Sequence, residues 1–161
     1  MNIKLFVMDV DGTMTDGKIY IGNSGEIFKS FDVKDGYGIH SILPSKNIFP
    51  VVLTGRKSDI VKNRCDELEI PYVIQGSKNK VVDLELLMNK LGLGWENVAC
   101  VGDDLNDLNI IRKAEWSACP NDAVDEIKKE CDFVASKVGG RGAIRESIEA
   151  LILLVDNINF Q

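Results

Sequence analysis

The segment Ile3–Gly12, with the sequence IKLFVMDVDG, decides how the rest of this chain is interpreted. Its first part, Ile3–Met8, is an apolar run of the length of a buried strand, and Asp9 and Asp11 follow it. A strand that is apolar on both faces is typical of a parallel sheet that helices cover on both sides. Ligands of such sheets bind beyond the carboxyl ends of the strands, so the two aspartates lie where a site is expected.

The remainder of the chain alternates between short apolar runs and helix-like segments. This alternation predicts an α/β fold with a doubly wound, mostly parallel sheet. Lys18–Phe31 interrupts the alternation, because two short stretches around Gly22-Asn23-Ser24-Gly25 predict a β-hairpin. Further strands are expected at Ile48–Leu53, Tyr72–Ile74, Val98–Val101, Trp116–Ala118 and Phe133–Ala135. Helices are expected at Asp35–Leu43, Lys57–Leu68, Lys78–Leu91, Asp104–Lys113 and Ala123–Lys129, and from the Gly139–Gly142 turn to about Val155.

Length and charge exclude several classes of protein. With 161 residues, of which 45% are hydrophobic, the chain is expected to form one domain, residues 1–161. Its net charge of −6 argues against nucleic-acid binding, which needs a basic surface. No apolar run has the length of a membrane-spanning helix and no signal-peptide layout is present, so we expect no membrane contact and a cytoplasmic protein. The four cysteines match no zinc spacing, which favours free thiols.

Residue types that bind metals and phosphates follow four of the predicted strands. Asp9 and Asp11 follow the first strand, Thr54-Gly55-Arg56 the second, Gln75-Gly76 the third, with Lys80 nearby, and Gly102-Asp103-Asp104 the fourth. Carboxylates are suitable ligands for a hard cation such as Mg²⁺. A lysine, a hydroxyl group and backbone N–H groups suit a phosphate. The sequence therefore predicts metal-assisted phosphate chemistry at this edge of the sheet.

The spacing of Asp9 and Asp11 suits the hydrolysis of a phosphate ester. Residues two apart in an extended segment point the same way. Asp9 can attack phosphorus as a nucleophile, while Asp11 gives a proton to the leaving oxygen and later takes one from water. Gly12 allows the chain to turn sharply after them.

Other metal- and phosphate-binding motifs do not fit these residues. An EF-hand loop that starts at Asp9 needs Gly and Glu where the chain has Met14 and Tyr20. No GxxxxGK[ST] loop occurs, and Gly36-Tyr37-Gly38 does not continue into a GxGxxG motif. A phosphoryl-receiver domain is disfavoured as well, because no lone Asp follows the second or third strand.

The same residues resemble the four signatures of the haloacid-dehalogenase (HAD) superfamily phosphatases. Asp9–Thr15, with the sequence DVDGTMT, is similar to the first signature, and Thr54 to the second. Lys80 is similar to the third, and Gly102–Asp107, with the sequence GDDLND, to the fourth. The resemblance implies a HAD-like Rossmannoid fold with a β-hairpin flap, and Mg²⁺ as the cofactor.

Narrower motifs along the whole chain resemble the 3-deoxy-D-manno-octulosonate 8-phosphate (KDO 8-phosphate) phosphatases. These motifs are Phe31–Ile39, Thr54–Lys57, Gln75–Lys80 and Gly139–Glu146. The resemblance implies Mg²⁺-dependent hydrolysis of a sugar-acid phosphate through an aspartyl-phosphate, within lipopolysaccharide precursor synthesis. Two alternatives stay open. One is a phosphatase for nine-carbon sialic-acid-type 9-phosphates, since His40 stands where octulosonate enzymes often carry Arg. The other is a non-catalytic partner of a sugar-nucleotide synthetase.

The resemblance also implies a role for each matching residue. Asp9 is then the nucleophile and a Mg²⁺ ligand, and Asp11 is the acid and base with its backbone carbonyl on the metal. Asp103 is the third metal ligand, while Thr54 and Lys80 bind the transferring phosphoryl group. Supporting residues are Asp104 and Asp107, and the positions that meet the sugar acid are Asp32, Val33, Lys34, Asp35, Gly36, His40, Arg56, Arg64 and Lys80.

A separate cap domain has no room in this chain. The predicted elements use all residues from Asp9 to Thr54 and from Thr54 to Lys80, where related phosphatases insert a cap. A cleft without a lid admits water and selects poorly among sugars. The resemblance implies a homotetramer in which neighbouring subunits complete each site, with Arg64 or the Gly139–Arg145 segment as the contributed part.

Overall fold

A six-stranded parallel sheet organises the part of the chain that the structure, a computed structural model, describes: residues 1–158. The strands are β1 (Leu5–Met8), β4 (Phe49–Thr54), β5 (Tyr72–Gln75), β6 (Val98–Val101), β7 (Trp116–Cys119) and β8 (Phe133–Val134). Their order is β5-β4-β1-β6-β7-β8, and every neighbouring pair is parallel. β1 lies in the interior of the sheet because all four of its residues are buried and need cover on both faces. The mostly parallel sheet predicted from the sequence is confirmed.

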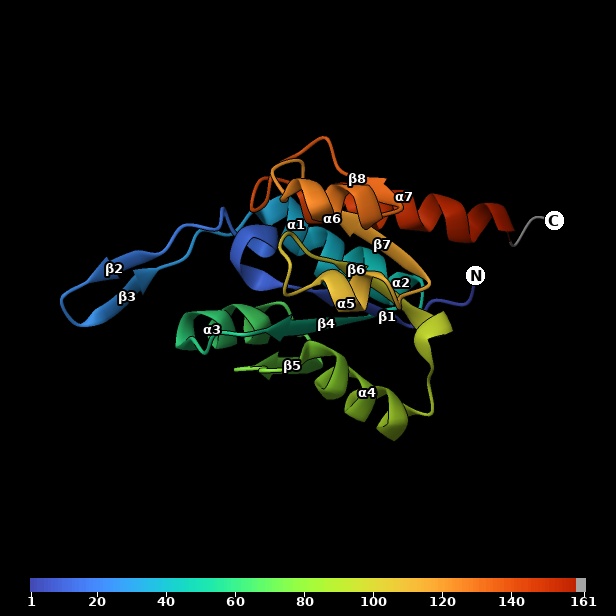
Figure 1. Cartoon of the computed structure of the whole chain (residues 1–161), viewed down its shortest axis with the longest axis horizontal. Coiled ribbons are helices and arrows are strands. Elements are labelled where there is room, and N and C mark those ends of the chain that lie inside the picture. Colours follow the sequence, from blue (N-terminus) through green and yellow to red (C-terminus); the bar gives the residue numbers. More distant parts are fainter. Residues whose placement is uncertain (159–161) are drawn as a thin grey trace.

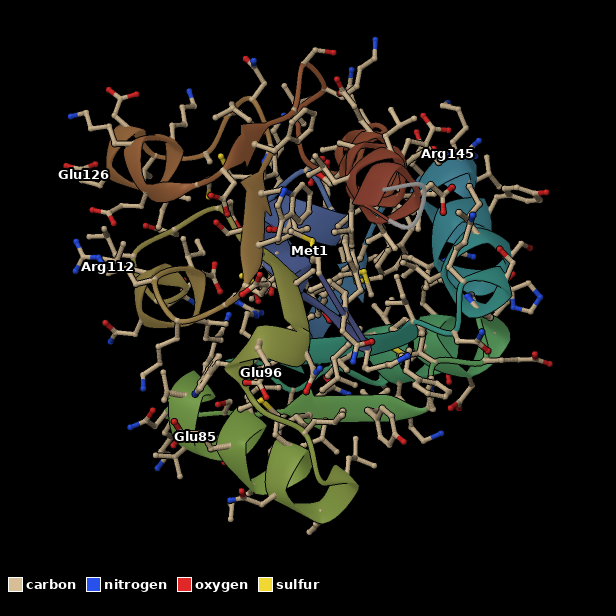
Figure 2. The ribbon with its side chains drawn as sticks, turned by 90° about the vertical axis from the view of Figure 1, so that its right-hand side faces the viewer. Met1, Glu85, Glu96, Arg112, Glu126 and Arg145 are labelled. Atoms are coloured by element: carbon tan, nitrogen blue, oxygen red, sulfur yellow. The ribbon has the colours of Figure 1, made fainter. Side chains whose placement is uncertain are left out.

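Helices cover both faces of the sheet, and each face has its own apolar core (Figure 2). One face carries α1 (Val33–Tyr37), η2 (Gly38–Ile42), α2 (Leu43–Ser45), α3 (Asp59–Glu67) and α7 (Ala143–Ile158). The other face carries α4 (Lys80–Leu91), α5 (Leu108–Ile111) and α6 (Asp125–Glu130). Along β1, Phe6 and Met8 belong to the first core, whereas Leu5 and Val7 belong to the second. The doubly wound arrangement therefore follows from the two-residue period of a strand.

The predicted hairpin is present and projects from one end of the molecule (Figure 1). Its strands are β2 (Tyr20–Gly22) and β3 (Gly25–Phe28), which pair antiparallel. The rings of Tyr20 and Phe28 stack with their centroids 4.2 Å apart. Ile21 and Ile27 are 70% and 61% exposed, so much of the apolar surface of the hairpin has no cover among residues 1–158.

One predicted helix is much shorter than expected, and a side chain explains the difference. The helix predicted at Asp104–Lys113 is reduced to α5, which starts at Leu108. The carboxylate of Asp107 accepts hydrogen bonds from the backbone N–H groups of Asp103 and Asp104. These bonds hold residues 103–107 in a turn, so the helix begins only after it.

Another helix starts before its predicted position. The helix expected at Asp35–Leu43 begins at Val33 and continues through η2 and α2 to Ser45. Asp32 caps its first turn by accepting a hydrogen bond from the backbone N–H of Lys34. The other expected elements agree with the structure within a few residues at their ends.

Two further observations concern the helices and the cysteines of residues 1–158. Within this range, no helix combines the length and the apolar character needed to cross a membrane. Cys65, Cys100 and Cys119 are buried and Cys131 is partly buried, and all four are free thiols. Free thiols agree with the expectation from their spacing.

Candidate active site

A cleft of about 330 Å³ lies at the carboxyl end of the central strands. β1, β4 and β6 are neighbours in the sheet and run in the same direction, so the residues that follow them meet at one edge. The residues that line the cleft follow three of the strands and are Asp9, Asp11, Thr54, Gly55, Arg56, Asp103, Asp104, Leu105 and Asn106. Gln75 and Gly76, expected in the same group, do not line it, and the side-chain amide of Gln75 is hydrogen-bonded to the backbone of Ser58.

The turn after β1 brings the backbone of Gly12 close to the carboxylate of Asp103. Asp9 continues the strand in an extended conformation, and its backbone N–H donates to the carbonyl oxygen of Val101 in β6. Gly12 then adopts a positive φ of 93°, which favours glycine. A Cβ atom at this position would lie 2.1 Å from Oδ2 of Asp103. Glycine is therefore required both for the turn and for the approach of Asp103.

Asp9 and Lys80 form a buried ion pair at the base of the cleft. The ammonium group of Lys80 lies 2.9 Å from Oδ1 of Asp9 and 2.7 Å from Oδ1 of Asp107. Burial, together with the charge of Asp107, raises the pKa of Asp9 to about 6, although Lys80 lowers it in part. Burial alone lowers the pKa of Lys80, but Asp107 and Asp9 outweigh it and the pKa is raised. Lys80 therefore remains charged and neutralises part of the carboxylate cluster.

The carboxylates of Asp9, Asp103 and Asp107 fit a divalent cation. One oxygen of each lies within 4.8 Å of the others. Burial raises the pKa of Asp103 to about 7, and the charges of Asp9, Asp107 and Asp104 add to this, which indicates that the cluster lacks positive charge. Asp107 is already held by Lys80 and by two backbone N–H groups, so Asp9 and Asp103 are the better ligands. Thr13 orients Asp103 by donating a hydrogen bond of 2.8 Å to its Oδ1.

The surroundings of Asp11 contain two residues that sequence reasoning missed. Lys29 directly follows β3, and its ammonium group lies 2.5 Å from Oδ1 of Asp11 and 2.8 Å from Oε1 of Glu26. Arg56 approaches the same two carboxylates at 3.8 and 3.7 Å. No motif or spacing marks Lys29 or Glu26, because the hairpin brings them to Asp11 from a separate part of the chain. The only available signal was the position of Lys29 between two aromatic residues, Phe28 and Phe31.

Several residues expected to meet the sugar acid do not line the cleft. Asp35 is buried, and its carboxylate accepts hydrogen bonds from the backbone N–H groups of Gly142 and Arg145 at the start of α7. Burial raises the pKa of Asp35 to about 6. Asp32 caps α1, and Gly36 packs against Arg64, while Val33 and Lys34 are exposed. In this chain the Asp32–Gly36 segment forms the start of α1, Asp35 links it to the start of α7, and none of its residues lines the cleft.

Arg64 and His40 also lie outside the cleft. Arg64 is mostly buried, with its guanidinium group 5.6 Å from the centroid of the Phe31 ring and paired with Glu67. His40 is exposed, and its Nδ1 lies 3.2 Å from the carbonyl oxygen of Leu68. Of the expected sugar-binding positions, the cleft of the single chain contains Arg56, with Lys80 at its base.

The Gly139–Gly142 turn supports the loop that follows β1 in its own chain. The backbone N–H of Gly140 donates to the carbonyl oxygen of Thr13. A Cβ atom at Gly139 would lie 1.9 Å from the carbonyl oxygen of Gly12. The close approach of these two backbones requires glycine at position 139.

Comparison with known proteins places this site in a family. The model of the haloacid dehalogenase-like hydrolase family matches residues 69–145. This is the class of protein that the parallel sheet and its carboxylate-lined edge define. The 3-deoxy-D-manno-octulosonate 8-phosphate phosphatase of Salmonella typhi is 45% identical over 152 residues, which cover 94% of this chain and 80% of that protein. The chain belongs to the family of these phosphatases.

Solved structures of related proteins have the same fold. The 3-deoxy-D-manno-octulosonate 8-phosphate phosphatase of Yersinia pestis matches with a TM-score of 0.91 and 37% identity, covering 98% of this chain and 85% of that one. The phosphatase of Moraxella catarrhalis, crystallised with a magnesium ion, a phosphate ion and KDO, matches with a TM-score of 0.89 and 36% identity. The match covers 99% of this chain and 94% of that one. The fold expected from the four signatures is confirmed.

Proposed function

We propose that the protein hydrolyses 3-deoxy-D-manno-octulosonate 8-phosphate to the free sugar acid and phosphate, with Mg²⁺ as cofactor. The observation that carries this proposal is the joint placement of Asp9, Asp11, Thr54 and Asp103 around one cleft, with Lys80 paired to Asp9. Membership of the family supports the choice of substrate, because its members are named for this reaction.

The first step transfers the phosphoryl group to the protein. A carboxylate oxygen of Asp9 attacks phosphorus, and the bond between phosphorus and the sugar oxygen breaks. The leaving oxygen takes a proton from Asp11, so the sugar departs as a neutral alcohol. Thr54 and Lys80 bind the phosphoryl oxygens, and their hydrogen bonds strengthen as charge develops there.

The second step regenerates Asp9. Water attacks the phosphorus of the aspartyl-phosphate, and Asp11, now a carboxylate, takes a proton from that water. The bond between phosphorus and the carboxylate oxygen of Asp9 breaks, which releases phosphate. Asp11 loses its proton in the first step and regains one in the second, so the same residue serves as acid and then as base.

Asp9 and Asp103, with the backbone carbonyl of Asp11, are the proposed ligands of Mg²⁺. Oxygen ligands of this kind suit a hard cation, and the raised pKa values of both carboxylates agree with a site that needs positive charge. When bound, the metal supplies charge that offsets the repulsion between the substrate phosphate and the carboxylates.

Phosphate release tests the proposal. Asp9→Asn keeps the size of the side chain but removes the nucleophile, so we expect kcat to fall about 10³-fold or more. Asp125→Asn, an exposed carboxylate at the start of α6, is the matched control and should retain full activity. A chelator should abolish release, and Mg²⁺ should restore it. If the wild-type protein releases no phosphate, the protein is the non-catalytic alternative; if it prefers a nine-carbon 9-phosphate, the sugar assignment is wrong.

The proposed working form is a homotetramer of the cytoplasm whose product enters lipopolysaccharide precursor synthesis. An isolated two-stranded hairpin is marginally stable in water, so the exposed Ile21 and Ile27 call for cover, which copies of the same chain can provide. Arg64 and the Gly139–Arg145 segment are the two parts that a subunit could offer to a neighbouring site, although in the single chain Arg64 is paired with Glu67 and the Gly139–Gly142 turn packs on the loop after β1. The four free thiols agree with a reducing compartment.

A further inference from the structure

We propose that Lys29, at the base of the hairpin, is a positioning residue that holds Asp11 for proton transfer. This inference rests on the proposed phosphatase activity, in which Asp11 is the acid and the base. The side chain of Lys29 is 1% exposed, and that of Asp11 is 19% exposed. Lys29 therefore contacts Asp11 from the protein side, and the cleft side remains open to a substrate.

The contacts of Lys29 distinguish the two oxygens of Asp11. The ammonium group donates a hydrogen bond to Oδ1 at 2.5 Å. Oδ2 is left with Arg56, whose Nε lies 3.8 Å away and whose side chain is half exposed. Because Lys29 occupies Oδ1, Oδ2 is the oxygen that carries the proton and transfers it to the leaving group. Lys29 also limits rotation of the carboxylate, which keeps Oδ2 directed to one place.

Lys29 is itself held by a second carboxylate. Glu26 lies 2.8 Å from its ammonium group and accepts a hydrogen bond of 2.5 Å from the hydroxyl of Ser58, in the segment before α3. The chain Ser58–Glu26–Lys29–Asp11 thus joins the loop after β4, the hairpin and the catalytic loop. A movement of the hairpin relative to the sheet would change the position of Asp11.

The burial of Lys29 argues for a role of its charge beyond packing. Removing an ammonium group from water is costly, and a pair of buried charges seldom stabilises a protein more than apolar residues of similar volume. The chain nevertheless has a lysine at position 29, and this lysine contacts Asp11, the proposed acid and base. A methionine would fill a similar volume without fixing the carboxylate.

Substrates with different leaving groups distinguish loss of Asp11 positioning from a general disturbance of the structure in Lys29 variants. An alkoxide such as the C8 oxygen of the sugar is a poor leaving group and needs the proton from Asp11. A nitrophenolate leaves without one. A residue that acts by orienting the acid should therefore affect the sugar phosphate much more than p-nitrophenyl phosphate in the step that releases the leaving group.

The experiment measures leaving-group release in single turnovers with both substrates. For Lys29→Met we expect a loss of about 10²-fold with the sugar phosphate and less than about tenfold with the aryl phosphate. Lys29→Arg keeps a donor on Oδ1 and should recover most of the rate. Lys46→Met, which removes a lysine paired with Asp156 on the surface, is the matched control and should match wild type with both substrates.

Other outcomes would overturn the assignment. Equal losses with the two substrates, or no loss with either, contradict a role through Asp11. In the background of Asp11→Asn, Lys29→Met should cause no further loss with the aryl phosphate, and an additional loss there would also contradict it. If Lys29→Met fails to fold, Glu26→Gln, which loosens the lysine, must show the same preference for loss on the sugar phosphate. A wild-type protein inactive on both substrates would instead refute the proposed function.

Discussion

The two buried lysines of the site are held by different parts of the molecule. Lys80 is the first residue of α4, lies at the base of the cleft and bridges Asp9 and Asp107. Lys29 follows β3 and bridges Asp11 and Glu26. β3 belongs to the hairpin that projects from one end of the molecule (Figure 1). Each lysine thus neutralises one carboxylate of the Asp9-Val10-Asp11 motif and one carboxylate from elsewhere.

The difference lies in what holds each lysine. Lys80 is carried by α4, which packs on the sheet and depends on contacts that one chain supplies. Lys29 is carried by a segment whose outer surface is largely uncovered in the single chain. Asp9, the proposed nucleophile, is therefore held by the fold of one chain alone, whereas the position of Asp11, the proposed acid and base, depends on a segment that we expect neighbouring subunits to hold.

The largest effect is expected at the lysine that the fold supports. Lys80→Met leaves Asp9 and Asp107 without their buried partner, which costs about 3–5 kcal/mol of the free energy of unfolding. It also removes a phosphate ligand, so kcat/KM should fall about 10³-fold or more. Urea unfolding and phosphate-release kinetics measure the two effects. A stable variant with wild-type kcat/KM would show that Lys80 has no role in the site.

A charge on the outer surface of the hairpin tests the other half of the comparison. Ile27→Asp should weaken the proposed tetramer and lower kcat/KM by about tenfold, because a neighbouring subunit that covers the hairpin would no longer support Lys29. Analytical ultracentrifugation reports the assembly. Val82→Asp makes the same change on α4, where the side chain is 47% exposed, and serves as the control. A tetramer that survives Ile27→Asp would refute the proposed role of the hairpin.

The last prediction concerns stability alone, at a buried carboxylate that no lysine contacts. Burial raises the pKa of Asp35 to about 6, above the value of about 4 in an unfolded chain. The folded state then binds more protons than the unfolded state, so the contribution of Asp35 to stability is greatest below pH 4. It is lost as the pH rises to 6, by about 2 kcal/mol. The difference in unfolding free energy between wild type and Asp35→Asn should show this decline.

Glu26 provides the matched comparison for that profile. Burial alone raises its pKa, but the hydrogen bonds from Lys29 and Ser58 outweigh burial and the pKa is lowered. The contribution of Glu26 is therefore present above its unfolded pKa and is lost as the pH falls, which is the opposite sign. The difference in unfolding free energy between wild type and Glu26→Gln should therefore decrease as the pH falls. Two declines of the same sign would mean that Lys29 does not compensate the burial of Glu26.

Much of the fold, and the part of the cleft formed by residues after the strands, could be predicted because the local sequence pattern and the sheet topology determine them together. Apolar runs predicted strands, and parallel strands present the residues that follow them at one edge, so Asp9, Thr54 and Asp103 had to meet. The reduced α5 was missed because the Asp107 carboxylate competes with the helix for backbone N–H groups. The sugar contacts expected at residues 32–36 were placed by resemblance alone and stay a prediction, while in the single chain Asp35 holds the start of α7.

The sequence by itself determined the order of the strands along the chain, the carboxylates after them and the hairpin between them. These features depend on the spacing of residues close in sequence, which the two-residue period of a strand and its turn residues encode. The tertiary structure alone decided which lysine meets Asp11 and which aspartate turns inward to α7. Such contacts depend on the path of a whole segment through space, and the cost of burying a charge permits them only where the fold brings a partner within reach.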